Sequence, residues 1–118
     1  MNKVNLIGNL ATDITFNVRS KAQGKQTTVV ASSILAVNKI PSRKHPDRKP
    51  SADFIPLTAF NQMAITMADH LAKGARIGVT GRLHPSRWTD KNGKRRFDME
   101  VIVDRVYFLS PRKKDLGQ

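Results

Sequence analysis

The chain has 118 residues, enough for one domain around one hydrophobic core and too few for two. It contains no cysteine, which excludes disulfides and thiolate metal sites, and it has no apolar run as long as a signal-peptide core or a membrane span. Its 21 Lys and Arg against 9 Asp and Glu give a formal net charge of +12, which favours a polyanionic partner. Without a strongly basic amphipathic helix, nucleic acid fits this charge better than a membrane. We therefore expect a soluble, intracellular protein.

The N-terminal third of the chain predicts strands. Residues 3–10 alternate roughly between polar and apolar side chains, with Val4 and Leu6 on one face. Gly8 inside this run indicates a bulge or the close approach of another backbone. Residues 13–18 continue the run as a second, kinked piece of the same strand. Residues 27–38 follow a basic turn and predict a strand because they are rich in β-branched and small side chains.

Residues 39–50 break the strand pattern with three prolines and five cations against Asp47. Proline removes a backbone donor and favours an exposed, extended loop. Two interpretations stay open, a solvated connector and a basic arm that lies along phosphates.

Residues 53–60 resume as a strand with two different faces. The core face holds Ile55, Leu57 and Ala59, and the other, available to solvent or a ligand, holds Phe54, Pro56, Thr58 and Phe60. Because Pro56 cannot donate a ladder hydrogen bond, it indicates an edge position or a bulge.

A single helix is predicted over residues 61–73. Asn61 is the expected N-cap, Met63, Met67 and Leu71 recur every four residues as a core stripe, and Gly74 is the expected C′ glycine.

Residues 77–109 predict a long β-hairpin. Two runs rich in β-branched and aromatic residues flank Asn92-Gly93, a dipeptide that accepts the positive φ angles of a tight turn. The only tryptophan, Trp88, precedes this turn among five cations, with Asp90 as the sole nearby acid. An aromatic plane among cations suits a polyanion that carries flat bases.

The order of these elements predicts an all-β protein, a five-stranded OB-fold barrel with one α-helix between strands 3 and 4. We assign residues 1–110 to this domain and residues 111–118 to a short basic tail.

The sequence shows no catalytic constellation. The acids form no metal-ligand motif, and Asp98, Glu100 and Asp104 fit the polar face of a half-solvated sheet. The three histidines have no ligand spacing, and no phosphate-binding glycine loop is present. We expect no enzyme activity, metal or cofactor.

Binding remains, and the aromatic residues favour single strands over duplexes. The predicted helix is nearly free of the Arg, Asn and Gln of a duplex reader, with only Asn61 and Gln62 at its start. Trp88, Phe60 and Phe54 fall on strands beside basic loops and are candidates for base stacking. The candidate phosphate contacts are Arg19, Lys21, Arg43, Lys44, Arg48, Lys49, Lys73, Arg87, Lys94, Arg95 and Arg96.

The chain resembles the bacterial single-stranded DNA-binding proteins over about residues 1–110. The resemblance lies in residues 2–10 (Asn-Lys-Val-Asn-Leu-Ile-Gly-Asn-Leu) with Asp13, in 35–36, 53–60, 70–74 and 79–83, in 87–93 (Arg-Trp-Thr-Asp-Lys-Asn-Gly), and in 100–104. It implies that Trp88 and Phe60 match base-stacking positions and that Phe54 matches a position where tryptophan is frequent.

The resemblance also implies a homotetramer, or less often a dimer. The oligomer interface would be the first strand, at Lys3, Val4, Asn5, Leu6 and Ile7, which pairs with its symmetry mate. No stacking tryptophan stands near 39–41, and residues 110–118 lack the family's acidic tip. Either the sequence stops short of a natural tail, or the protein does not recruit replication and repair enzymes by this route.

Other interpretations stay open. The chain could be an adapter like primosomal replication protein N, whose main role is docking replication proteins. RNA is an alternative ligand, because no residue in the sequence reports on a 2′-hydroxyl.

Overall fold

The computed structural model describes residues 1–20, 27–39, 44 and 51–110. Four of the predicted phosphate contacts, Lys21, Arg43, Arg48 and Lys49, lie outside the described residues, as do most of the proline-rich loop and the basic tail. The elements are β1 (Val4–Leu10), β2 (Thr15–Ser20), β3 (Thr27–Asn38), β4 (Ala52–Phe60), α1 (Asn61–His70), β5 (Arg76–Thr89) and β6 (Arg95–Phe108).

The strands form one closed sheet in the order β1-β5-β6-β4-β3-β2, closed by the pairing of β1 with β3. Both β1 and β2 run antiparallel to β3, with Leu10 opposite Leu35 and Thr15 opposite Ser32. They are therefore consecutive pieces of one kinked strand, as predicted. Counted so, the barrel has five strands and confirms the predicted OB-fold. The helix lies between β4 and β5, one label later than predicted, because the first strand is divided in two.

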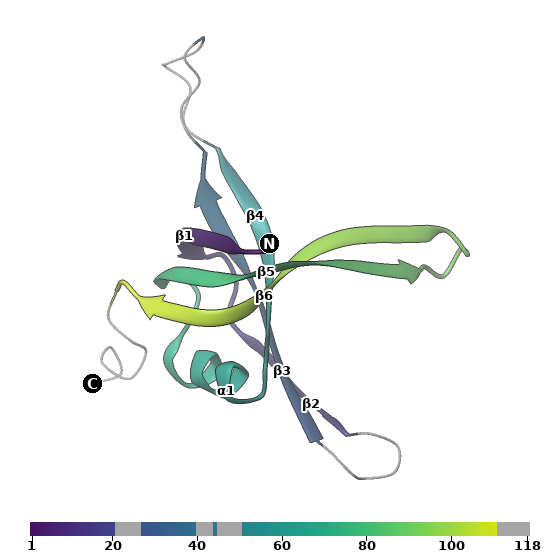
Figure 1. Ribbon diagram of the computed structural model, residues 1–118, viewed down its shortest axis with the longest axis horizontal. Coiled ribbons are helices and arrows are strands. Elements are labelled where there is room, and N and C mark those ends of the chain that lie inside the picture. The colour runs from purple at the N-terminus through teal and green to yellow at the C-terminus, as the bar shows by residue number, and fades with distance from the viewer. Residues whose placement is uncertain (21–26, 40–43, 45–50, 111–118) are drawn as a thin grey trace.

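The core fills the barrel and the space under the helix. Its largest fully buried side chains are Leu10, Leu35, Leu57, Met67, Ile77, Val79 and Val101. Figure 1 shows α1 beside the barrel strands at the end nearest β2, where Ala64 and Met67 are fully buried. This confirms the predicted core stripe, because Leu71 is also buried and Met63 packs against the core.

The ends of the helix differ from the prediction. Asn61 is not the N-cap but the first helical residue, and its side chain accepts a hydrogen bond from the backbone N–H of Val29 at 3.3 Å. The helix ends at His70 instead of residue 73. Gly74 does need its positive φ of 93°, but it serves a turn after the helix and is not its C′ residue.

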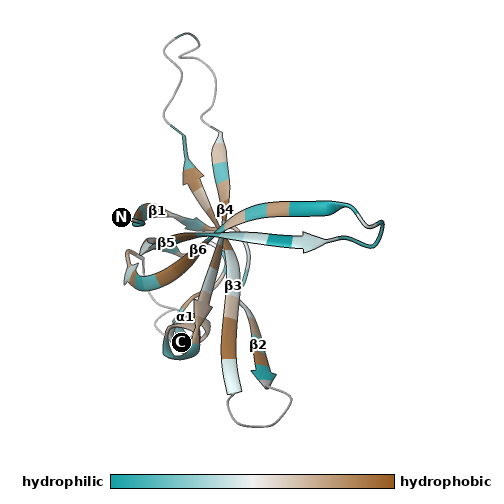
Figure 2. Ribbon diagram, turned by 45° about the vertical axis from the view of Figure 1, so that its right-hand side comes forward, coloured by the Kyte–Doolittle hydropathy of each residue, from teal (hydrophilic) through white to brown (hydrophobic). Residues whose placement is uncertain are grey.

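The hairpin of β5 and β6 projects from the barrel (Figure 1). Its base contributes Val79, Val101 and Val103 to the core. Its outer half, from His84 to Glu100, contains no buried residue, and Figure 2 shows mostly hydrophilic colours along that part of β6. The outer half, residues 84–100, is called the arm below.

Candidate nucleic-acid interface

The predicted faces of β4 are confirmed. Leu57 and Ala59 are fully buried, while Phe54 and Phe60 on the other face are 65% and 39% exposed. The two phenylalanines are six residues apart on one strand, about 20 Å at the usual rise of a strand. They can therefore contact different bases but not the same one.

Pro56 lies where β4 has one neighbour. It is opposite Ile34 of β3, and the pairing of β4 with β6 involves only Leu57 and Thr58. This agrees with the predicted edge position, because proline has no N–H and at Pro56 β4 is paired with a strand on one side only.

Trp88 is 49% exposed on the arm and lies opposite Arg96 of β6. The turn beside it differs from the predicted tight turn. Gly93 has a positive φ of 78°, but Asn92 does not. In the described part of the chain, Asn61 is the only residue other than glycine with a positive φ. Instead the Gly93 N–H bonds to the Asp90 carbonyl at 3.0 Å, and the Asp90 N–H bonds to the Lys94 carbonyl at 2.9 Å. The loop is longer than two residues, with glycine in the left-handed position.

The Asp90 carboxylate organises this loop. Its Oδ1 accepts the backbone N–H groups of Asn92 at 2.9 Å and Lys94 at 3.0 Å, and its Oδ2 accepts Nε of Arg96 at 2.9 Å. The Lys94 N–H is the largest of these influences, and together they hold the pKa of Asp90 below its usual 3.8. Arg96, a predicted phosphate contact, is thus already paired with a carboxylate.

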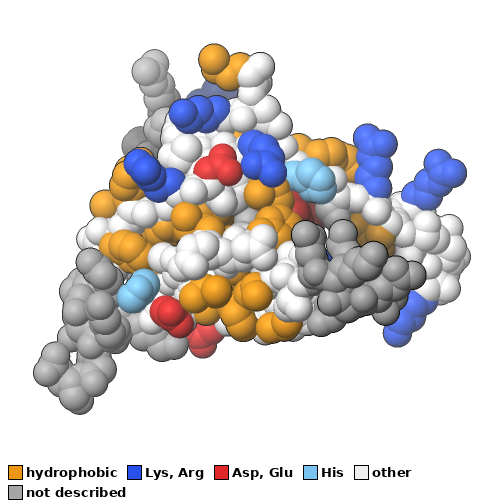
Figure 3. All heavy atoms as spheres, turned by 60° about the horizontal axis from the view of Figure 1, so that its bottom comes forward, with side chains coloured by type: hydrophobic (Ala, Val, Ile, Leu, Met, Phe, Trp, Pro, Cys, Tyr) orange, Lys and Arg blue, Asp and Glu red, His pale blue; other side chains and the backbone are white. Residues whose placement is uncertain are grey.

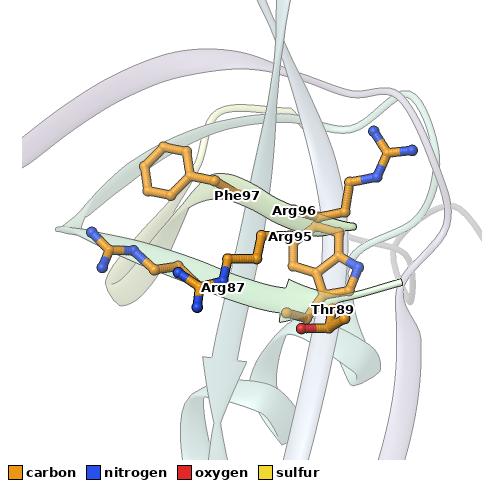
Figure 4. A pocket seen from close by; sticks show the side chains of 6 residues that line it. Arg87, Thr89, Arg95, Arg96 and Phe97 are labelled. Atoms are coloured by element: carbon orange, nitrogen blue, oxygen red, sulfur yellow. The ribbon is translucent and has the colours of Figure 1, made fainter. Parts of the chain in front are cut away.

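Phe97 is a candidate that the sequence did not single out. Its ring is 60% exposed, it lies opposite Arg87, and the Arg87 guanidinium carbon is 5.6 Å from the ring centroid. Figure 4 shows the Phe97 and Arg87 side chains extending to one side of the hairpin and Arg96 extending to the other. Hydropathy alone gives no signal for it, because residues on both faces of the arm are exposed.

These side chains border a shallow hollow of about 460 Å³ on the arm, lined by Arg87, Trp88, Thr89, Arg95, Arg96 and Phe97. Figure 3 shows Lys and Arg side chains projecting to opposite sides at this end of the molecule. An exposed aromatic side chain beside guanidinium groups can stack a base and neutralise the adjoining phosphates.

The structure does not bring all the predicted cations together. Arg87, Lys94, Arg95 and Arg96 meet at the arm. Arg19 lies on β2, opposite Thr28, and Lys73 follows the helix. Lys44 is the one residue of 40–50 that the structure describes. Binding by the whole set therefore requires a ligand that extends across the molecule.

The acids of β6 lie where a polar sheet face predicts. Asp104 pairs with Arg82 at 3.3 Å, and Glu100 lies 3.7 Å from His84. Among the described residues no group of His, Asp and Glu is arranged to hold a metal ion. No helix in the described part of the chain is long and apolar enough to cross a membrane.

Comparisons with known proteins agree on one family. The model of the single-strand binding protein family matches residues 1–109. A single-stranded DNA-binding protein of Clostridium tetani is 37% identical over 109 residues, covering 92% of this chain and 70% of that protein. Single-stranded DNA-binding protein 1 of Staphylococcus aureus is 34% identical over 118 residues, covering 100% of this chain and 71% of that protein. Among solved structures, the Plasmodium falciparum SSB in complex with ssDNA superposes with a TM-score of 0.75 at 26% identity, covering 93% of this chain and 96% of the other.

Proposed function

Since the chain belongs to the single-strand binding protein family, we propose that it binds and protects single-stranded DNA in replication, recombination or repair, with little regard to sequence. The observation that carries this proposal is the set of exposed aromatic rings, Trp88, Phe54 and Phe60, on the strands of a chain with a net charge of +12. Rings that project from a basic surface can stack any base, because every base has a π face.

The protein would act by binding, without catalysis, metal or cofactor. Bases stack on the rings, and the predicted Lys and Arg residues neutralise phosphates along the strand. We place this activity in the cytoplasm at the nucleoid, where single-stranded DNA arises. The comparisons give no support to an adapter role, since these relatives carry the name of single-stranded DNA-binding proteins.

Titration with oligothymidine tests the proposal. Trp88 is the only tryptophan, so its emission should change as bases stack on it. The affinity should also fall with salt, with a log–log slope of about −0.7 per phosphate contact. Emission that stays constant while labelled oligothymidine saturates the protein would exclude stacking on Trp88. Competition with an RNA strand of matched length decides between DNA and RNA.

Substitution of Trp88 gives the matched test. We expect Trp88→Ala to weaken binding by about 1–3 kcal/mol and Trp88→Phe to retain most of the affinity, because a smaller ring still stacks. Circular dichroism should be unchanged in both variants, since the side chain is half-exposed. An equal loss of duplex binding would mean that Trp88 acts through folding.

A further inference from the structure

The two faces of the arm carry different side chains. Alternation and register place His84, Ser86 and Trp88 of β5 on one face, with Glu100, Asp98 and Arg96 opposite them. We call this the Trp88 face. The other, the Phe97 face, holds Pro85, Arg87 and Thr89 of β5, with Met99, Phe97 and Arg95 opposite them.

The charges on the two faces have opposite balance. On the Trp88 face, Arg96 is bound to Asp90, and Asp98 and Glu100 add two more carboxylates. The Phe97 face carries Arg87 and Arg95 and, among these six residues, no acid. At low salt, phosphates are therefore attracted to Arg87 and Arg95 on the Phe97 face and repelled by Asp98 and Glu100 on the Trp88 face.

We propose that the Phe97 face of the arm is a second binding surface for single-stranded DNA, in which a base stacks on Phe97 and phosphates bind Arg87 and Arg95. The inference rests on the proposed function. It adds to single-stranded DNA binding a surface on the side of the arm away from Trp88. With rings on both faces, the arm lies between two segments of bound strand.

The local geometry supports stacking on Phe97. Arg87 lies over the ring at 5.6 Å, and the ring is still 60% exposed, more than Trp88 at 49%. Arg95 is two residues before Phe97 on the same face of β6, about 7 Å along the strand. One cation thus lies over the ring and a second beside it, where they can bind the phosphates of a nucleotide stacked on the exposed part of the ring.

Moving the only tryptophan across the arm tests the proposal directly. In the double variant Trp88→Phe, Phe97→Trp, the indole reports on the Phe97 face alone. We expect its emission to change on saturation with oligothymidine, with binding followed independently by the anisotropy of labelled DNA. Saturation without a change in emission would overturn the inference and leave the proposed function standing. Failure of the wild-type protein to bind would overturn the proposed function itself.

Two further variants test the same surface through affinity. Phe97→Ala and Phe97→Leu should each weaken binding roughly 5- to 100-fold, because both lose the ring, and the leucine variant does so while keeping much of the apolar volume. Unchanged affinity in both variants would contradict the assignment.

The neighbouring arginines provide a matched pair of equal charge. Arg95→Gln should reduce the salt slope by about 0.7 and weaken binding more than Arg96→Gln, whose side chain is engaged by Asp90. A salt slope and an affinity that Arg95→Gln leaves unchanged would show that no phosphate binds the Phe97 face and overturn the proposal. Unchanged circular dichroism in each variant assigns the losses to binding.

Discussion

Gly8 is a position where the closure of the barrel leaves room only for hydrogen. A Cβ atom there would overlap the backbone carbonyl of Ala36, at the point where β1 meets β3. The close backbone approach predicted from the sequence is therefore confirmed.

We predict that Gly8→Ala destabilises the fold by about 1–3 kcal/mol, because backbone must move to admit the methyl group. Gly78→Ala is the control, since the nearest atom to its added Cβ is the Tyr107 Cβ at 3.6 Å, an ordinary contact. Denaturant unfolding measures both. Equal destabilisation by the two substitutions would show that loss of glycine, and not the overlap at Gly8, is responsible.

Asp90 gives the arm a defined dependence on pH. Because its pKa in the folded protein lies below the usual 3.8, the ionised form is favoured by folding. The stabilisation is thus present above that usual value and is lost as the pH falls through the lowered pKa. An NMR titration should find the Asp90 pKa below 3.8. Arg96→Gln should raise it only part of the way, because the Lys94 N–H is the larger influence. A full return to 3.8 would contradict this order of causes.

Residue patterns predicted some of the site and missed part of it. The exposure of the Phe54 and Phe60 rings follows from alternation, because the core-facing residues between them, Ile55, Leu57 and Ala59, are all apolar. Beyond the barrel both faces of the hairpin are exposed, so hydropathy no longer separates them, and Phe97 emerges only from its register with Arg87. Asn61 shows the same limit, since its bond to Val29 joins residues far apart in the chain.

At the scale of elements, long-range pairing overrides local propensity at the end of α1. The helical pattern continues to residue 73, but the segment after His70 bonds to the end of β1. The Gly74 N–H donates to the Leu10 carbonyl and the Leu10 N–H to the Ala75 carbonyl, both at 2.8 Å. The kink between β1 and β2 was predictable because the strand pattern resumes after 10–13, whereas this backbone pairing leaves no mark in the local sequence.

The arm should be separable from the barrel. Replacing residues 87–97 by Asn-Gly joins the paired residues Ser86 and Asp98 through a two-residue hairpin turn. We expect little change in the melting temperature, because no buried residue is removed. Affinity for oligothymidine should fall and the salt slope should become shallower, since both rings and the cations of the arm are lost. Unchanged binding by the folded variant would assign the DNA to the barrel alone.

At the scale of the whole molecule, β1 presents an incomplete edge and an apolar face. Among the described residues, β1 pairs with β3 only at Asn9 and Leu10, so the rest of β1 has β5 as its single neighbour. Val4 and Leu6 pack against the core, while Ile7 is 56% exposed. Ile7 lies in a hollow of about 460 Å³ that Tyr107 and Leu109 also line. An unpaired edge beside an apolar hollow is a surface that a second copy of the chain can cover.

The oligomer predicted from the first strand can be tested at Ile7. Light scattering on the wild-type protein should give a multiple of 13.2 kDa, four chains if a tetramer forms and two if a dimer forms. Ile7→Glu should lower that mass, because assembly would bury an unpaired carboxylate in an apolar contact. Val18→Glu is the control, an equally exposed aliphatic residue on β2 at 60% exposure, and should leave the mass unchanged. A wild-type monomer, or an Ile7→Glu variant of undiminished mass, would exclude this face as the interface. Oligothymidine titrated into each variant then shows whether assembly is needed to hold a strand that must reach Arg19 as well as the arm.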